Sequence, residues 1–217
     1  KSEVRRVALH SGEVEQSHKL SKEDFGEGLV ALHHSWGDEL LQLLWRTGRG
    51  WRYNLTADGS IVAPGEGIRT PLHSGWGLEQ LENGKLVATD GGQNLYTLDN
   101  RSFKLLRTRP VTDDGRAVLM VNELEIVDGS LWANIYAKEC LARIDPTTGV
   151  VTGWALLHGL KDPKQGDVLN GIAWDAASKK LFITGKLWPS LFEVELIESS
   201  VSLKEARDMC IPEKSLF

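Results

Sequence analysis

The sequence predicts an all-β protein and, within that class, a five-bladed β-propeller. Asp128-Gly129, between two short alternating segments, is the strongest short-range signal for a β-hairpin. In addition, three different sequence elements each recur about every 45 residues, with about four predicted strands per repeat and little helix. An isolated blade would expose both of its apolar faces, so the repeats are expected to close into a ring. A β-sandwich built from similar hairpins is the alternative.

The repeats are defined by a turn, a motif at the start of a strand, and the strand that follows. The turn follows an apolar strand and occurs at His10, Asn54, Asp99, Asp145 and Glu195. The motif at the start of a strand is centred on Glu27, Gly77, Glu123 and Gly171. The strand that follows it covers Leu41–Trp45, Leu86–Asp90, Leu131–Tyr136 and Leu181–Lys186. The common spacing of the three series favours the propeller over the sandwich.

Two of these three series differ in number, because the turn occurs five times and the strand-start motif four times. We therefore expect a five-bladed propeller that lacks the inner strands of its first blade, with one further motif about 20 residues before Lys1 if the period holds. The expected organisation is one domain over 1–217. It has a remnant of blade one at 1–22, blades two to five over about 23–196, and a polar tail at 197–217 with one short helix over 203–208.

Composition narrows the function classes. The net charge of −5, without a basic patch, argues against a nucleic-acid partner. No apolar run approaches the roughly 18 residues of a membrane span. Eight Trp against five Phe and three Tyr indicate an aromatic-lined site. Cys140 and Cys210 allow one disulfide or none, and neither belongs to a metal-binding Cys-x-x-Cys pair. The sequons at Asn54 and Asn100 are compatible with a secretory route but also arise by chance.

Three residues are candidates for chemistry, each with a simpler structural interpretation. Glu27 lies between Gly26 and Gly28; near a central channel its pKa would rise and suit proton transfer, whereas in a turn it would be an exposed glutamate. Trp76, also between glycines, belongs at a rim or in the core. Lys186 ends a strand, where it is either a solvated turn residue or a stabiliser of negative charge on oxygen.

The remaining candidates would form the walls of the same mouth. Trp45 and Tyr136 end their strands at equivalent positions of neighbouring blades and would face it together with Trp76. Such a slot fits a small side chain or a peptide terminus. Asn122 and Asn170 belong to the strand-start series and supply neutral donors and acceptors, or simply satisfy backbone groups at the strand ends.

Six motifs follow one another along the chain, namely Phe25–Leu29, Gly75–Leu78, Asn122–Glu125, Trp132–Asn134, Val168–Asp175 and Thr184–Pro189. Taken together and in this order, they resemble the plant and bacterial type glutaminyl cyclases, a family of five-bladed propellers. The resemblance extends from about Val4 to Leu196.

The resemblance implies a glutaminyl-peptide cyclotransferase, which converts N-terminal glutamine of peptides or proteins to pyroglutamate and releases ammonia. It assigns the proton transfers to Glu27, stabilisation of the oxyanion to Lys186, the aromatic pocket to Trp45 and Trp76, and a polar contact to Asn122. It implies no metal and no other cofactor. A monomer in the secretory pathway or outside the cell is expected, with vacuole, cell wall and periplasm as alternatives.

The chain departs from the family pattern in three places. Tyr136 stands where the family usually has a tryptophan. The first-blade motif Phe-Thr-Gln-Gly-Leu, which supplies an aromatic residue and a glutamine to the site, is absent, so weak activity is one expectation. An insertion of about four residues at 33–37 is expected to alter the rim. Plant members have cysteines near the places of Cys140 and Cys210, and the resemblance therefore implies a disulfide that ties the tail to the fourth repeat.

Two other functions compete with the cyclase. One is a non-catalytic propeller that binds a peptide or protein at its mouth. The other is a metal-dependent lactonase, which would need Glu27, Asn122, Asn170 and Asp90 as a central ligand cluster and would leave the tryptophans and Lys186 without a role.

Overall fold

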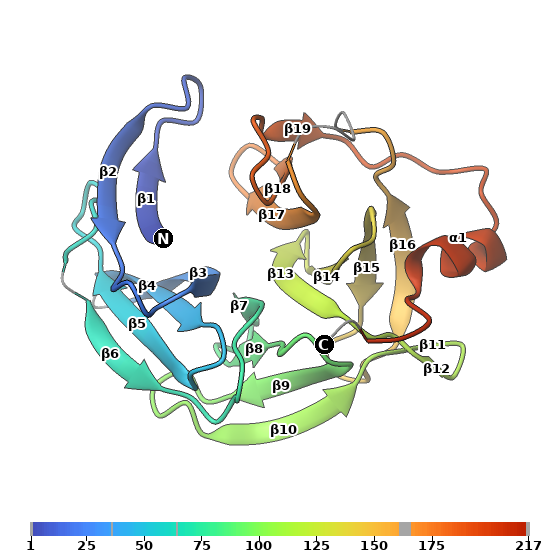
Figure 1. Cartoon of the computed structure of the whole chain (residues 1–217), viewed down its shortest axis with the longest axis horizontal. Coiled ribbons are helices and arrows are strands. Elements are labelled where there is room, and N and C mark those ends of the chain that lie inside the picture. Colours follow the sequence, from blue (N-terminus) through green and yellow to red (C-terminus); the bar gives the residue numbers. More distant parts are fainter. Residues whose placement is uncertain (1, 36, 64, 161–165, 216–217) are drawn as a thin grey trace.

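The computed structural model describes residues 2–35, 37–63, 65–160 and 166–215. Its regular structure is almost entirely antiparallel β-sheet, arranged as four blades around a centre (Figure 1). The first blade contains β3 (Gly26–His34), β4 (Gly37–Leu44), β5 (Arg49–Asn54) and β6 (Glu66–Arg69). The second contains β7 (Leu78–Gln80), β8 (Leu86–Ala88), β9 (Asn94–Leu98) and β10 (Leu105–Pro110). The third contains β13 (Val121–Val127), β14 (Ser130–Ile135), β15 (Cys140–Ile144) and β16 (Val151–Leu156).

The fourth blade is three-stranded, and two small sheets complete the described structure. The fourth blade contains β17 (Leu169–Asp175), β18 (Lys180–Gly185) and β19 (Phe192–Val194). The small sheets are β1 (Glu3–Val7) with β2 (Val14–Lys19), and β11 (Thr112–Asp113) with β12 (Arg116–Ala117). The all-β prediction and the propeller-like arrangement are confirmed, whereas a ring of five blades is not.

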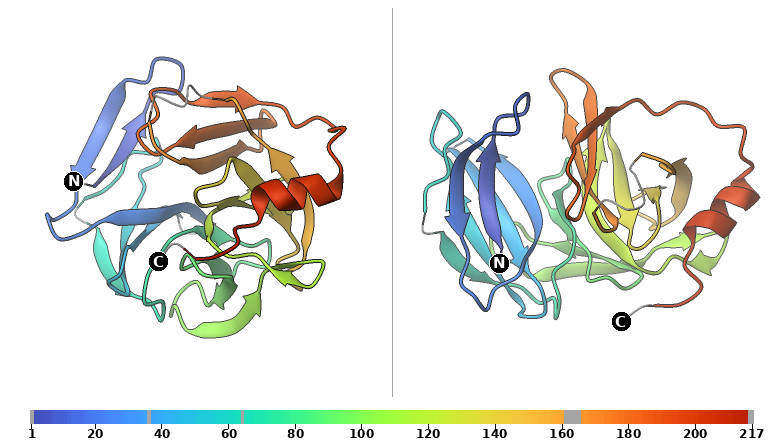
Figure 2. Two further views of the ribbon diagram at one scale, coloured as in Figure 1. Left: turned by 45° about the vertical axis from the view of Figure 1, so that its right-hand side comes forward. Right: turned by 45° about the horizontal axis from the view of Figure 1, so that its top comes forward.

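The inner strands of successive blades pack against one another. Strand β3 contacts β7, β7 contacts β13, and β13 contacts β17, so the four inner strands surround the centre (Figures 1 and 2). The apolar side chains between the blades form separate clusters, one of which fills the space between the second and third blades around Leu95, Val121 and Leu124. Burial of these faces is the main stabilising contribution to the arrangement.

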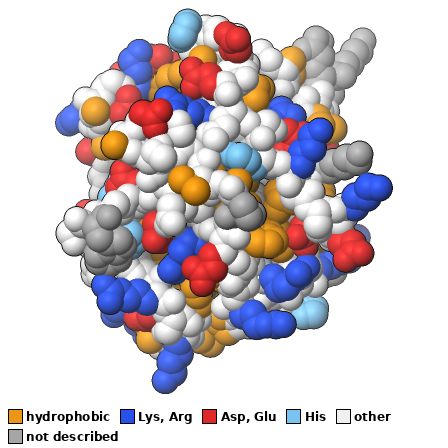
Figure 3. All heavy atoms as spheres, turned by 90° about the vertical axis from the view of Figure 1, so that its left-hand side faces the viewer, with side chains coloured by type: hydrophobic (Ala, Val, Ile, Leu, Met, Phe, Trp, Pro, Cys, Tyr) orange, Lys and Arg blue, Asp and Glu red, His pale blue; other side chains and the backbone are white. Residues whose placement is uncertain are grey.

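The β1–β2 sheet packs on the first blade. Val4 shares a buried apolar cluster with Tyr53 and Ile61. The Gln16 side chain donates to the Ile61 carbonyl at 2.7 Å and accepts from the Ile61 N–H at 2.8 Å, which satisfies both backbone groups of that residue. On the face of the molecule beside this sheet, acidic, basic and hydrophobic side chains are interspersed (Figure 3).

Two local predictions can be compared directly with the structure. Asp128 and Gly129, with φ of 47° and 78°, connect β13 to β14 by a tight turn between Val127 and Ser130, as the Asp-Gly signal predicts. The expectation that residues 33–37 alter the rim of the mouth is wrong. The hairpin β3–β4 reaches His34 and Gly37 at its tip, at the opposite end from Gly26 and Leu44, so the insertion lengthens the hairpin away from the mouth.

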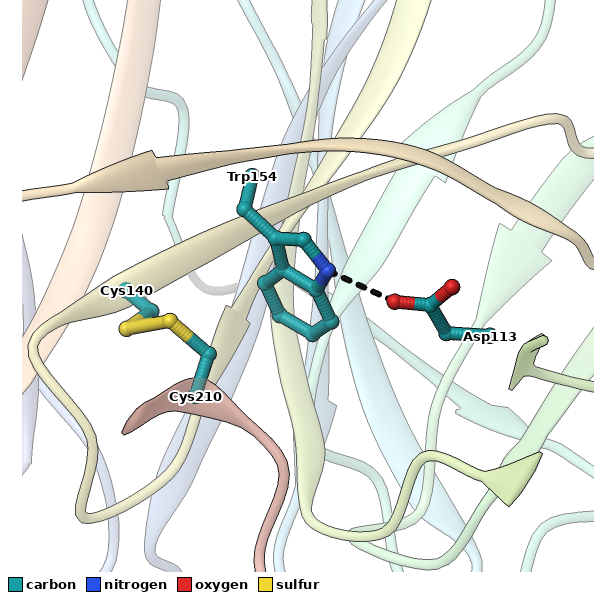
Figure 4. Close-up of a disulfide and its surroundings, with 4 residues drawn as sticks. All are labelled: Asp113, Cys140, Trp154 and Cys210. Carbon is teal, nitrogen blue, oxygen red and sulfur yellow. Dashed lines mark hydrogen bonds between the residues drawn. A yellow bond between two sulfur atoms is a disulfide. The ribbon is translucent and has the colours of Figure 1, made fainter. Parts of the chain in front are cut away.

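The tail carries helix α1 (Leu203–Cys210), close to the predicted 203–208. Ser202 begins it, with a capping box in which the Ser202 side chain accepts from the Glu205 N–H and the Glu205 side chain accepts from the Ser202 N–H. Its last residue, Cys210, is bonded to Cys140 of β15, with the Cα atoms 5.7 Å apart (Figure 4). The expected pairing is therefore present.

A second contact fixes the same helix. Arg207 of α1 forms a 2.8 Å ion pair with Asp113. The Asp113 carboxylate also accepts a 2.8 Å hydrogen bond from the indole N–H of Trp154, as Figure 4 shows. The tail is thus attached to the third blade by a covalent bond and by a buried carboxylate.

Candidate active site

Residues at the start of the inner strands line the site because these strands are bulged. The pairing register shifts between Gly26 and Leu29, between Val121 and Leu124, and between Leu169 and Ile172. A bulge leaves a residue outside the ladder and redirects its side chain, and bulges are frequent beside active sites. The three bulges contain Glu27, Asn122 and Asn170.

The bulges and the ends of the following strands enclose one cavity of about 320 Å³. The structure brings together in it all six residues that the sequence proposes for catalysis and substrate binding. It adds Asn170, which the sequence offers only as a neutral donor or acceptor. The lining residues are Phe25, Gly26, Glu27, Trp45, Trp76, Asn122, Tyr136, Asn170 and Lys186.

Glu27 is the ionisable group at the start of β3, and it is half-buried. Desolvation by burial raises its pKa to about 7, and the positive charge of Lys186 limits the rise. A carboxyl group with this pKa exchanges protons readily near neutral pH, as general acid–base chemistry requires.

Lys186 is held at the cavity by its backbone. Its N–H donates to the Val168 carbonyl at 2.9 Å, and its own carbonyl accepts from the Asp167 N–H at 2.7 Å. The Trp188 indole N–H fixes the same segment by donating to the Asp167 carbonyl at 2.9 Å. The exposed ammonium lies 5.3 Å from the ring centroid of Phe25. Its positive charge lowers the pKa of Glu27, so the cation lies close enough to the Glu27 carboxyl to interact with it.

Aromatic rings form the other walls. Trp76, only 7% exposed, meets Tyr136 edge-on with the ring centroids 5.4 Å apart. Phe25 and Trp45 are tilted against each other at 5.8 Å. Behind Trp76, a Cβ atom on Gly91 would lie 2.5 Å from the indole ring, and the φ of +81° there also favours glycine. These contacts give the apolar slot a defined shape.

Thr89 links two walls of the cavity, and sequence reasoning missed it. Its buried hydroxyl accepts a 2.7 Å hydrogen bond from the Gly77 N–H and donates a 2.8 Å hydrogen bond to the Asn122 carbonyl. The close approach requires glycine, because a Cβ atom on Gly77 would lie 2.1 Å from that carbonyl oxygen. Trp76 and Asn122 are therefore held in register by one side chain. The only signal in the sequence is a threonine at the end of an apolar strand.

Three glutamates connect the inner strands of neighbouring blades, and sequence reasoning did not single them out. The Ile126 N–H donates to Glu79 at 3.2 Å, the Ile172 N–H to Glu123 at 3.2 Å, and the Trp174 N–H to Glu125 at 2.7 Å. Each bond joins one blade to the next. None of the three carboxyls lines the cavity.

Burial raises the pKa of all three glutamates, and neighbouring carboxyls add to the rise for Glu123 and Glu125. The pKa of Glu125 is raised to about 8, first by desolvation and then by the charge of Glu79. Burial also raises the pKa of Glu79, and burial together with Glu125 and Glu79 holds the pKa of Glu123 well above its usual range. The alternation of Glu123 and Glu125 between apolar residues was the available sequence signal.

The four-ligand cluster of the lactonase alternative does not assemble. Asp90 does not line the cavity that holds Glu27, Asn122 and Asn170. Its carboxylate instead accepts from the Tyr96 hydroxyl at 2.8 Å and from the Gly92 N–H at 2.9 Å. Within the described ranges, no group of three or more His, Cys, Asp and Glu side chains is arranged to hold a metal ion. No described helix is long and apolar enough to cross a membrane.

Comparison with known proteins identifies similar chains. The sequence model of the family described as glutamine cyclotransferase matches residues 1–196. The chain is 41% identical over 207 residues to a glutaminyl-peptide cyclotransferase from Arabidopsis thaliana, a match that covers 92% of this chain and 62% of the relative. It thus spans less than two thirds of that relative's length. The crystal structure of Myxococcus xanthus glutaminyl cyclase superposes with a TM-score of 0.73 and 34% identity, covering 88% of this chain and 81% of the other.

Proposed function

Because the chain belongs to the glutamine cyclotransferase family, we propose that it converts the N-terminal glutamine of peptides or proteins to pyroglutamate and releases ammonia. One observation carries the proposal: a half-buried carboxyl, Glu27, with its pKa raised to about 7, lies in an aromatic cavity that also contains Lys186. The cavity offers one group that exchanges protons at neutral pH and one cation that stabilises negative charge on oxygen.

Binding accounts for the first part of the proposed mechanism. Cyclisation requires the α-amine of glutamine to approach its own side-chain amide carbonyl, and holding this folded conformer lowers the entropic part of the barrier. Trp45, Trp76 and Tyr136 form the apolar walls against which the side-chain methylenes pack. The side-chain amide of Asn122, which is 3% exposed, supplies a polar contact in the cavity.

Two proton transfers through Glu27 complete the reaction. As the α-amine nitrogen bonds to the amide carbon, the carboxylate of Glu27 accepts a proton from that nitrogen. The ammonium of Lys186 stabilises the negative charge that develops on the carbonyl oxygen. The protonated Glu27 then donates the proton to the amide nitrogen, the carbon–nitrogen bond breaks, and ammonia leaves. The carboxylate is regenerated, so no net proton is consumed.

The proposal extends to architecture and location. We place β1 and β2 as the outer strands of a fifth blade, because they pack beside the first described blade as a two-stranded unit. The propeller is proposed as one domain over 1–217 that acts as a monomer. The Cys140–Cys210 disulfide and the exposed sequon at Asn54 support a secretory or extracellular location with glycosylation.

The test is ammonia release from a peptide with N-terminal glutamine, measured with and without chelator. We expect chelator-resistant turnover that is lost in Glu27→Gln and retained in Glu23→Gln, a matched change at an exposed glutamate nearby. Tight peptide binding without turnover in the unmodified chain would replace the proposal with the non-catalytic propeller. Loss of turnover on chelation would contradict the metal-free mechanism.

A further inference from the structure

The inner hairpins of all four described blades end in the same backbone pattern. A residue at the end of the second strand is followed by one with positive φ: Arg46 at 54°, Gly91 at 81°, Ala137 at 63° and Leu187 at 58°. The left-handed region is costly for residues other than glycine, by about 1 kcal/mol or more. The pattern nevertheless recurs in three blades with a side chain present, so the fold imposes it.

This pattern separates the lining of the cavity from its rim. In three blades the residue before the left-handed position lines the cavity, namely Trp45, Tyr136 and Lys186. Their N–H groups close the hairpins by donating to the carbonyls of Phe25, Met120 and Val168, each at 2.9 Å. The left-handed residues do not line the cavity.

The side chains at these left-handed positions therefore form a rim outside the cavity, and they differ in chemistry. Arg46 and Ala137 are exposed, and Leu187 is 83% exposed. Gly91 has no side chain. Among the four, Arg46 alone carries a charge.

Arg46 is held in place at the rim. Its guanidinium carbon lies 4.2 Å from the ring centroid of Trp45, a stacking contact with a wall of the cavity. Its backbone N–H donates at 3.3 Å to the hydroxyl of Ser74, which also accepts from the Trp76 indole N–H at 3.2 Å. No described carboxylate lies within 4.0 Å of the guanidinium. A fixed cation thus stands beside the mouth with its charge unneutralised by an ion pair.

We propose that Arg46 makes the site select peptides with acidic residues directly after the N-terminal glutamine. The inference rests on the proposed function, because it takes the glutamine as the occupant of the cavity. A glutamine bound there continues only through its own carbonyl, so the next residues leave through the mouth and pass the rim. An acidic side chain meets the Arg46 guanidinium, whereas a lysine at the same place is repelled by it.

The test compares three amidated peptides that carry Glu-Glu, Ala-Ala or Lys-Lys after the glutamine. We expect kcat/KM to be about five- to tenfold higher for the acidic than for the basic peptide at low salt, the size given by exposed ion pairs, with the difference mainly in KM and reduced at 0.5 M salt. Arg46→Glu is expected to remove or reverse the preference among the three peptides. Arg109→Glu, an identical change on exposed β10, leaves the preference intact.

Calorimetric binding of the same peptides keeps this inference separate from the proposed function. If the Ala-Ala peptide is not turned over by the unmodified chain, the cyclase proposal fails, and the charge preference is then read from the three dissociation constants. Equal preferences in the unmodified chain and Arg46→Glu, by turnover or by binding, would overturn the role of Arg46. So would an Arg109→Glu effect of the same size.

Discussion

The hydroxyl of Thr89 donates a 2.8 Å hydrogen bond to the backbone carbonyl of Asn122 in the next blade, and at the same time accepts one from the Gly77 N–H. Two walls of the cavity, Trp76 and Asn122, therefore depend on a single buried side chain that does not itself line the cavity.

Replacing Thr89 with valine keeps the shape and removes both hydrogen bonds. Two buried backbone groups lose their partner, so the free energy of unfolding is expected to fall by about 1–3 kcal/mol. Because Trp76 and Asn122 are then free to shift, kcat/KM for a glutamine peptide should fall about tenfold or more. Thr89→Ser retains the hydroxyl and should stay close to the unmodified chain. A folded Thr89→Val protein with unchanged kcat and KM would show that the link has no effect on the site.

The pH dependence of turnover should report the pKa of Glu27. The carboxylate is the form that accepts the proton, so kcat/KM is expected to fall as the pH drops below about 7. Lys186 lowers this pKa, and Lys186→Met should therefore move the acid limb to higher pH as well as reduce kcat. Lys180→Met, at the start of β18, the strand that ends just before Lys186, removes a lysine that pairs with Glu193 and should not move the limb. The same peptide is used throughout, so its own α-amine contributes equally to every profile.

The contribution of Glu27 to the free energy of unfolding should change with pH in the opposite direction to turnover. The folded-state pKa of Glu27, about 7, lies above the model-compound value of 4.5, so the stabilisation from its protonated form is complete below about pH 4.5 and is lost as the pH rises to about 7. Glu27→Gln avoids this loss and should be more stable than the unmodified chain at pH 8 by about 1–3 kcal/mol. The difference should disappear at pH 4.5. Denaturant unfolding at the two pH values measures it, and an equal difference at both would contradict the raised pKa.

Loss of the disulfide should weaken the fold without abolishing the chemistry. Cys140 and Cys210 are 70 residues apart, and closing a loop of that length stabilises a protein by about 4 kcal/mol in the chain-entropy description. The Cys140→Ala/Cys210→Ala variant should unfold at lower denaturant concentration and keep its turnover at temperatures where it is folded. Dithiothreitol should lower the midpoint of the unmodified chain and leave that of the double variant unchanged. Insensitivity of both would show that the bond contributes little.

Much of the fold could be predicted from local sequence. The Asp128-Gly129 turn has one strongly favoured backbone solution, and the structure adopts it. The short helix expected over 203–208 is present as α1, and the Ser202 capping box fixes its start. The number of blades was less accessible, because β1 and β2 pair with each other and present no inner strand among the described residues.

The same distinction between local and long-range features applies to the site. Side chains such as Glu27 and Lys186 belong to motifs, and the resemblance to a family placed them in a common mouth. Thr89 and the Glu79–Glu125 pair act across blades, where their partners are fixed by register shifts in the inner strands. The alternation of apolar and polar residues along a strand does not show which residue is bulged, so these contacts were not predictable from one sequence.

The left-handed residues that follow each inner hairpin have a consequence for how the proposed activity diversifies. Their backbone is fixed by the fold and they do not line the cavity, so exchanges at Arg46, Ala137 and Leu187 are expected to change what the mouth admits and to leave the proposed proton transfers unaltered. Preference for a substrate can drift in one set of positions while the chemistry is conserved in the adjacent set. A small library at these three positions would be a direct route to cyclases with altered sequence preference.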